Sequence, residues 1–205
     1  MDKKNSIKHK IIPSKYFELS GLILLIILYS CIVQAKSGNF LTTGNIHNVL
    51  KEIVVYGILS CALAFPLING TFDLSIESIA ALGGTCCGLL VKDGLYGLKT
   101  NLPVAILISV IICCVVGAVN GLLVAFTSID PFIVTLGSQV AVRGLVYIVG
   151  NNTAVTGLPD SFKALSNKPI LGVSMSIWIM ILVFVFMAIV LGKTAYGRKV
   201  YAIGG

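Results

Sequence analysis

Six long apolar stretches constrain the fold of this 205-residue chain more than any other feature of its sequence. A helix needs roughly 20 mostly apolar residues to cross the hydrocarbon core of a bilayer. The stretches approach or exceed that length, and they cover residues 19–35, 53–69, 74–91, 102–127, 131–149 and 171–191. The sequence therefore predicts an all-α fold, a polytopic transmembrane helix bundle with six spans.

The composition excludes several other classes of protein. Only 11% of the residues are charged and 57% are hydrophobic, whereas soluble domains carry about 25% charged residues. Disordered chains need low hydrophobicity, and nucleic-acid binding would need a basic face with interleaved aromatic residues. The segments between the stretches are too short for a separate catalytic domain. We expect no enzyme activity, no metal and no cofactor.

The positive charges predict an orientation. Five lysines precede residue 16, and Lys193, Arg198 and Lys199 follow the last stretch. Because cytoplasmic loops carry the excess of Lys and Arg, residues 1–18 and 192–205 are predicted to be cytoplasmic and residues 19–191 to form the membrane region. The first stretch also resembles a signal peptide ending at Val33-Gln34-Ala35, but five further stretches favour its retention as a span.

Asp73 and Glu77 are acidic residues at the start of the third stretch. Four residues apart, they are expected on one helical face, where the helix dipole favours negative charge and Asp73 can cap backbone N–H groups. Pro66 and Gly70 precede them and indicate an interrupted backbone, which inside a membrane is tolerated where it lines a cavity. Helix capping and a place in a transport route therefore both remain open.

Other polar or small residues inside the spans are candidates for structural roles. Arg143 either reaches the membrane interface with its long side chain or faces the bundle. Gly117 and Gly121 have the spacing of a helix-packing GxxxG motif. Asn120 lies between them and needs a partner, either across a helix interface or in a water-filled path.

Three segments of the chain resemble permease subunits of ribose-type ABC importers, a group that also includes branched-chain amino-acid permeases. They are residues 69–78, residues 117–121 taken together with 131–137 and 143–144, and residues 194–205. The order and spacing match over about residues 40–205. Two positions differ, because Glu77 replaces a glycine of the family and Phe72 replaces a small aliphatic residue.

The resemblance implies a non-catalytic translocation subunit for a sugar. Its partners would be an ABC ATP-binding subunit, a second permease copy and an extracellular or periplasmic sugar-binding protein, all at a cell membrane. Since the family has roughly ten spans, we expect this chain to be the N-terminal part of a longer permease. The residues that the sequence nominates are Asp73, Ser75, Glu77 and Asn120 for the translocation pathway, Gly117, Gly121, Pro131 and Arg143 for structure or an interface, and Gly197, Arg198, Lys199, Tyr201, Gly204 and Gly205 for the side that faces the ATPase.

Three alternatives stay open at this point. The solute could be a branched-chain amino acid or a nucleoside. The chain could be an ion-coupled secondary carrier that uses Asp73 and Glu77, although such carriers often contain inverted repeats and none is evident here. It could also be a six-span fragment without transport activity.

Overall fold

A computed structural model describes residues 15–92, 95 and 98–204, with side chains described from residue 19 onward. These residues form helices and one short hairpin, in two compact units, Met1–Val49 and Leu50–Gly205. The elements are α1 (Lys15–Ser37), α2 (Thr43–Ile68), α3 (Ile76–Lys92), α4 (Leu102–Phe126), α5 (Pro131–Val149), α6 (Asp160–Asn167), β1 (Pro169–Ile170), β2 (Val173–Ser174), α7 (Met175–Lys193) and α8 (Ala195–Gly204). The all-α fold is as the sequence predicts.

The first unit consists of α1, a short connection and the first turns of α2. The side chain of Gln34 accepts a hydrogen bond from the Leu41 N–H at 2.9 Å, and Asn45 donates to the Phe40 carbonyl at 2.8 Å. These bonds fix the connection locally. The apolar side chains of α1 are exposed from Leu19 to Tyr29, as expected of a helix whose solvent is lipid.

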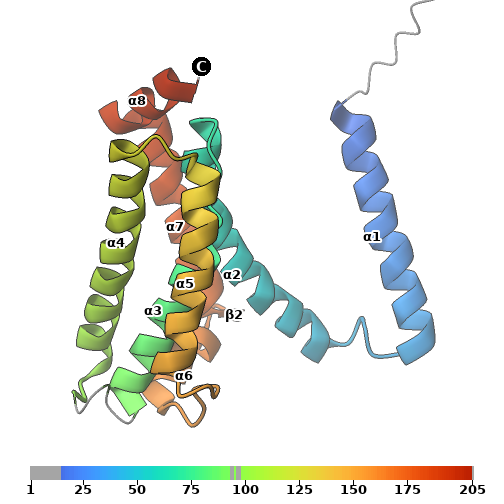
Figure 1. Cartoon of the computed structure of the whole chain (residues 1–205). Helices are drawn as coiled ribbons and strands as arrows, with labels where there is room; N and C mark the ends of the chain where they lie inside the picture. The colour runs from blue at the N-terminus through green and yellow to red at the C-terminus, as the bar shows by residue number, and fades with distance from the viewer. Residues whose placement is uncertain (1–14, 93–94, 96–97, 205) are drawn as a thin grey trace, which may run out of the picture. The chain divides into compact units, whose positions relative to one another are not determined.

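The core of the second unit is built around α3, which packs against α4 and α5 (Figure 1). One buried cluster joins Leu90 and Val91 of α3 to Ala105 of α4, and another joins Leu82 of α3 to Val142 of α5. Small residues allow the close approach. A Cβ atom added to Gly83 would lie 2.6 Å from Cys113 Sγ of α4.

The described residues contain five helices that are long and apolar enough to cross a membrane, namely α1, α2, α4, α5 and α7. The third predicted span, residues 74–91, corresponds to α3, which begins at Ile76 and has 17 residues, the lower limit for a transmembrane helix. At 1.5 Å per residue it is about 25 Å long, less than the roughly 30 Å hydrocarbon core. The residues immediately before Ile76, 71–75, are not helical.

The last stretch also begins later than its hydropathy predicts. Residues 169–174 form the β1–β2 hairpin, and α7 starts at Met175. Both residues of the two-residue turn, Leu171 and Gly172, have positive φ, as a tight hairpin turn requires. Turn geometry therefore overrides the apolar composition of this segment.

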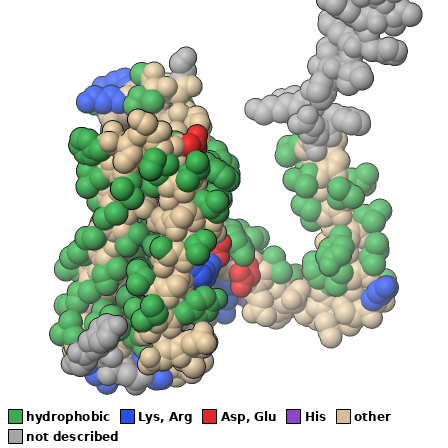
Figure 2. Space-filling model, viewed as in Figure 1, with side chains coloured by type: hydrophobic (Ala, Val, Ile, Leu, Met, Phe, Trp, Pro, Cys, Tyr) green, Lys and Arg blue, Asp and Glu red, His purple; other side chains and the backbone are tan. Residues whose placement is uncertain are grey.

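Charged and apolar surfaces are separated along the second unit. In Figure 1, α8 lies at one end of the bundle, and α6 lies at the other. Figure 2 shows Lys and Arg side chains at both ends, with hydrophobic side chains over most of the flank between them. Arg198 and Lys199 belong to the α8 end, and Lys163 belongs to the α6 end. This distribution suits a bundle with its flank in lipid and its ends in water.

Candidate functional site

The backbone is interrupted between α2 and α3. Helix α2 ends at Ile68, and Gly70 adopts a φ of +76°, the left-handed conformation that commonly terminates helices. The Thr71 N–H and hydroxyl both donate to the Pro66 carbonyl, at 2.9 and 3.1 Å. Residues 71–75 belong to neither a helix nor a strand and lead to the start of α3. We refer to residues 71–75 as the break.

A series of hydrogen bonds between polar side chains connects the break to α4. Asp73 Oδ1 accepts hydrogen bonds from the Ser75 N–H at 2.8 Å and from the Ser75 hydroxyl at 2.6 Å. Asn120 Nδ2 of α4 donates to Ser75 Oγ at 2.9 Å. Ser75 and Asn120 are both buried. The partner that Asn120 requires is therefore a residue of the break, across a helix interface.

Helix α5 contacts the backbone of the break through a threonine hydroxyl. The buried Thr135 hydroxyl lies 3.2 Å from the Phe72 carbonyl oxygen and 2.9 Å from the carbonyl of Pro131. A backbone carbonyl outside a regular helix needs such a donor when it is away from water. Sequence reasoning did not nominate Thr135, because a threonine in an apolar helix commonly bonds its own preceding turn.

An ion pair joins α3 to α5 next to the break. Arg143 Nη2 lies 2.5 Å from Glu77 Oε1, with side chains that are 36% and 64% exposed, respectively. Glu77 also occupies the first turn of α3, where the helix dipole favours a carboxylate. Arg143 thus has a partner within the bundle. Asp73 and Glu77 have separate partners, and Asp73 precedes the helix instead of sharing a helical face with Glu77.

Two cavities adjoin the break, and they share only Phe72 and Asp73. A cavity of about 280 Å³ lies between α2, the break and α5; its lining includes Tyr56, Ser60, Glu77 and Gln139. A cavity of about 240 Å³ lies between the end of α2, α4 and α5; its lining includes Thr71, Gly117, Asn120, Gly121 and Thr135. Gln139 was not nominated from the sequence, although an amide inside an apolar span is the signal that could have identified it.

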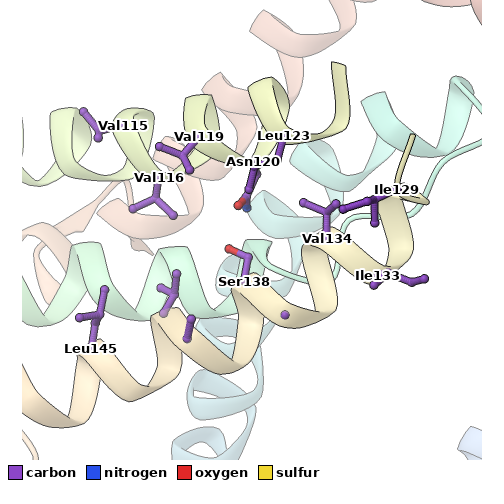
Figure 3. Close-up of a pocket in the computed structure, with 13 residues that line it drawn as sticks. Val115, Val116, Val119, Asn120, Leu123, Ile129, Ile133, Val134, Ser138 and Leu145 are labelled. Carbon is purple, nitrogen blue, oxygen red and sulfur yellow. The ribbon is translucent and has the colours of Figure 1, made fainter. Parts of the chain in front are cut away.

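A larger groove between α4 and α5 differs from these cavities in its chemistry. It has a volume of about 580 Å³, and valine, leucine and isoleucine side chains form most of its walls. Figure 3 shows Asn120 and Ser138 directed toward one another across it. This groove suits apolar groups, because two polar side chains are its main hydrogen-bonding capacity.

The structural candidates Gly117, Gly121 and Pro131 lie around the second cavity. A Cβ atom added to Gly117 or Gly121 would meet nothing within 4 Å among the described residues, so the GxxxG spacing does not mark a close helix contact there. Pro131 occupies the start of α5, where Asp130 accepts a hydrogen bond from the Phe132 N–H at 2.8 Å. Proline suits this position because its missing N–H has no helical partner.

The residues nominated for the ATPase-facing side lie in α8, except Gly205, which falls outside the described residues. Gly197 is buried against the carbonyl groups of Val190 and Leu191, and Gly204 lies against the carbonyl of Ile68. Both contacts are too close for a Cβ atom. The side chains of Arg198, Lys199 and Tyr201 are exposed, so α8 presents two cations and an aromatic ring at the end of the bundle.

Comparison with known proteins gives these features a context. The family described as "Branched-chain amino acid transport system / permease component" matches residues 45–205. The L-arabinose ABC transporter permease protein AraH of Azospirillum brasilense is 32% identical over 91% of this chain and 53% of its own length. The ribose import permease protein RbsC of Escherichia coli K12 is 32% identical over 92% of this chain and 58% of its own length.

A further relative is the L-arabinose transport system permease protein AraH of Escherichia coli K12, which is 29% identical over 90% of this chain and 54% of its own length. The chain thus spans about half the length of the curated relatives it matches. No solved structure matches it. Because the family match covers most of the chain, including the break, the helices around it and α8, the protein belongs to the branched-chain amino acid transport system permease component family, a non-catalytic family of ABC transporter permeases.

Proposed function

We propose that this chain is a membrane-spanning permease subunit of an ATP-driven importer that translocates a sugar, a pentose, hexose or related monosaccharide, delivered by an extracellular binding protein. The observation that carries the proposal is the similarity to ribose and arabinose permeases over about nine tenths of the chain. The chain supplies part of the translocation pathway and no covalent chemistry.

In this proposal, the polar side chains around the break line the route of the solute. Asp73, Ser75 and Asn120 form a connected network beside two cavities, and Glu77 lines the first of them. Polar groups at membrane depth are costly unless they are paired or line a water-filled path. Their concentration at the break supports its assignment to the pathway.

The partners and the orientation are part of the same proposal. The α8 end, with residues 192–205, faces the cytoplasm and an ATP-binding subunit, and residues 1–18 lie on that side too. Residues 19–191 form the membrane region of a roughly ten-span permease that pairs with a second copy. The exposed cations of α8 support this orientation, because cytoplasmic segments carry the excess of Lys and Arg. Lys199→Cys, in a variant whose six native cysteines are replaced, is labelled with an impermeant reagent in right-side-out and inverted vesicles, and labelling only in inverted vesicles supports the orientation.

Reconstitution tests the function. The permease from the complete reading frame is placed in liposomes with its ATP-binding subunit, and uptake of labelled ribose and arabinose is measured with and without ATP and the binding protein. Uptake that requires both supports the proposal. Uptake that survives ATP depletion but is abolished by an uncoupler identifies an ion-coupled carrier, and uptake of leucine or a nucleoside in place of sugars reassigns the substrate.

A further inference from the structure

The two cavities beside the break meet at a single pair of residues. The lining of the first cavity comes from α2, the break, the start of α3 and Gln139 of α5. The lining of the second comes from the end of α2, α4, the start of α5 and the break. Only Phe72 and Asp73 belong to both linings, and we refer to this pair as the partition.

Both residues of this partition are held in place. The Phe72 carbonyl lies within hydrogen-bond distance of the Thr135 hydroxyl, and Asp73 Oδ1 accepts two hydrogen bonds from Ser75. The Phe72 side chain is 44% exposed, so its ring is not part of a packed core. The backbone at Phe72 and Asp73 is thus fixed by hydrogen bonds, and the Phe72 ring and the Asp73 carboxylate lie beside both cavities.

The cavities fit a small polar solute better than the larger groove of Figure 3 does. Each is close to the lower limit of about 300 Å³ for small-molecule sites, which suits a solute of monosaccharide size. Ser60, Glu77 and Gln139 on one side, and Thr71, Asn120 and Thr135 on the other, provide hydrogen-bonding groups within apolar walls. A solute covered with hydroxyl groups would leave most of them unpaired in the apolar groove.

Resting on the proposed function, we infer that the two cavities are consecutive parts of one solute route, and that Phe72 and Asp73 form its narrowest point. The Phe72 ring limits the size of the solute that passes. The Asp73 carboxylate accepts hydrogen bonds from its hydroxyl groups there. Phe72 is a specificity-determining residue in this inference, whereas the sequence marked it only as a position where the family has a small aliphatic residue.

Enlarging the ring tests the inference. Phe72→Trp is compared with the matched control Phe132→Trp, because Phe132 is 48% exposed, lies in the first turn of α5 and lines neither cavity. Both variants are reconstituted with the ATP-binding subunit, and sugar uptake and ATP hydrolysis are measured together. Phe72→Trp is expected to lower uptake about tenfold while ATP hydrolysis stays within about twofold of the unmodified protein. Phe132→Trp is expected to change neither.

A second variant keeps the inference testable if the tryptophan prevents assembly. Phe72→Ala widens the partition, so uptake is expected to stay within about twofold or to rise. Unchanged uptake in Phe72→Trp, an equal fall of uptake and ATP hydrolysis in both tryptophan variants, or loss of uptake in an assembled Phe72→Ala protein would each overturn it. Absence of ATP-dependent sugar uptake in the unmodified protein would instead overturn the proposed function.

Discussion

Helices α3 and α7 have similar lengths, 17 and 19 residues, but opposite environments. Helix α3 has eight buried residues, whereas α7 has none among the described residues. Among the described residues, the more apolar of the two helices is thus the one with no buried side chains. In lipid, apolar side chains gain little by leaving the solvent, and close packing of small residues with polar bonds determines which helix becomes the core. Four experiments test this contrast, in order of decreasing expected effect.

Truncating one leucine in each helix tests the contrast directly. Leu90 in α3 is 1% exposed and Leu182 in α7 is 69% exposed. Leu90→Ala leaves a cavity in the packed core and is expected to lower the free energy of unfolding by about 3 kcal/mol. Leu182→Ala is expected to change it by less than about 0.5 kcal/mol. Equilibrium unfolding in mixed detergent micelles measures both, and equal losses would contradict the contrast.

The close approach of α3 to α4 predicts the next largest effect. A Cβ atom at Gly83 would meet Cys113 Sγ, whereas one at the neighbouring Gly84 would meet nothing within 4 Å. Gly83→Leu is expected to lower the free energy of unfolding by about 2 kcal/mol through overpacking. Gly84→Leu is the control, with the same change in propensity and no clash. Thermal unfolding of the purified protein distinguishes the two, and a larger loss for the control would show that α3 packs through its other face.

The hydrogen bond between Asn120 and Ser75 is expected to contribute less to the free energy of unfolding than the packing of Leu90 or Gly83. Interhelical hydrogen bonds in membranes contribute about 0.6 kcal/mol on average and about 1.7 at most. A double-mutant cycle with Asn120→Ala and Ser75→Ala is expected to give a coupling energy of about 1 kcal/mol. Ser109 is a second buried polar residue of α4 and provides the control, since Ser109→Ala paired with Ser75→Ala should be additive.

The smallest effect is expected for the ion pair of Glu77 and Arg143. Because its side chains are 64% and 36% exposed, screening reduces its contribution to about 0.5 kcal/mol. Glu77→Gln and Arg143→Gln are expected to cost that much singly, and the double variant no more than either single one. Unfolding at low and high salt checks this, because the difference between the single variants and the unmodified protein should shrink as salt rises. A salt-independent loss above about 2 kcal/mol would indicate a desolvated pair.

The sequence predicted which segments are apolar helices better than it predicted where they begin. Five of the predicted stretches overlap helices that are long and apolar enough to span a membrane, because length and composition decide this property. Hydropathy extended the third helix to Leu74, since Leu74 is apolar, although the Asp73–Ser75 bonds keep that residue in the break. It extended the last helix to Leu171, which the hairpin turn holds at positive φ.

The candidate residues of the site were predictable singly, but their pairing was not. Asp73, Asn120 and Arg143 are conspicuous as polar residues in apolar surroundings. Asn120 lies 45 residues from its partner Ser75 in the sequence, and Arg143 lies 66 residues from its partner Glu77. Residue spacing along a single helix carries no information about contacts between such distant positions. Thr135 lies within 3.2 Å of the Phe72 carbonyl oxygen, a contact that only the packing of α5 against the break reveals.

The contact between Gly204 and the Ile68 carbonyl has a mechanical consequence. Ile68 is the last residue of α2, three residues before the break begins. Since the two backbones touch with no room for a methyl group, α8 has no slack in that direction. We therefore expect a displacement of α8 toward α2 to reach the last residue of α2 through backbone contact, without passing through a deformable side chain.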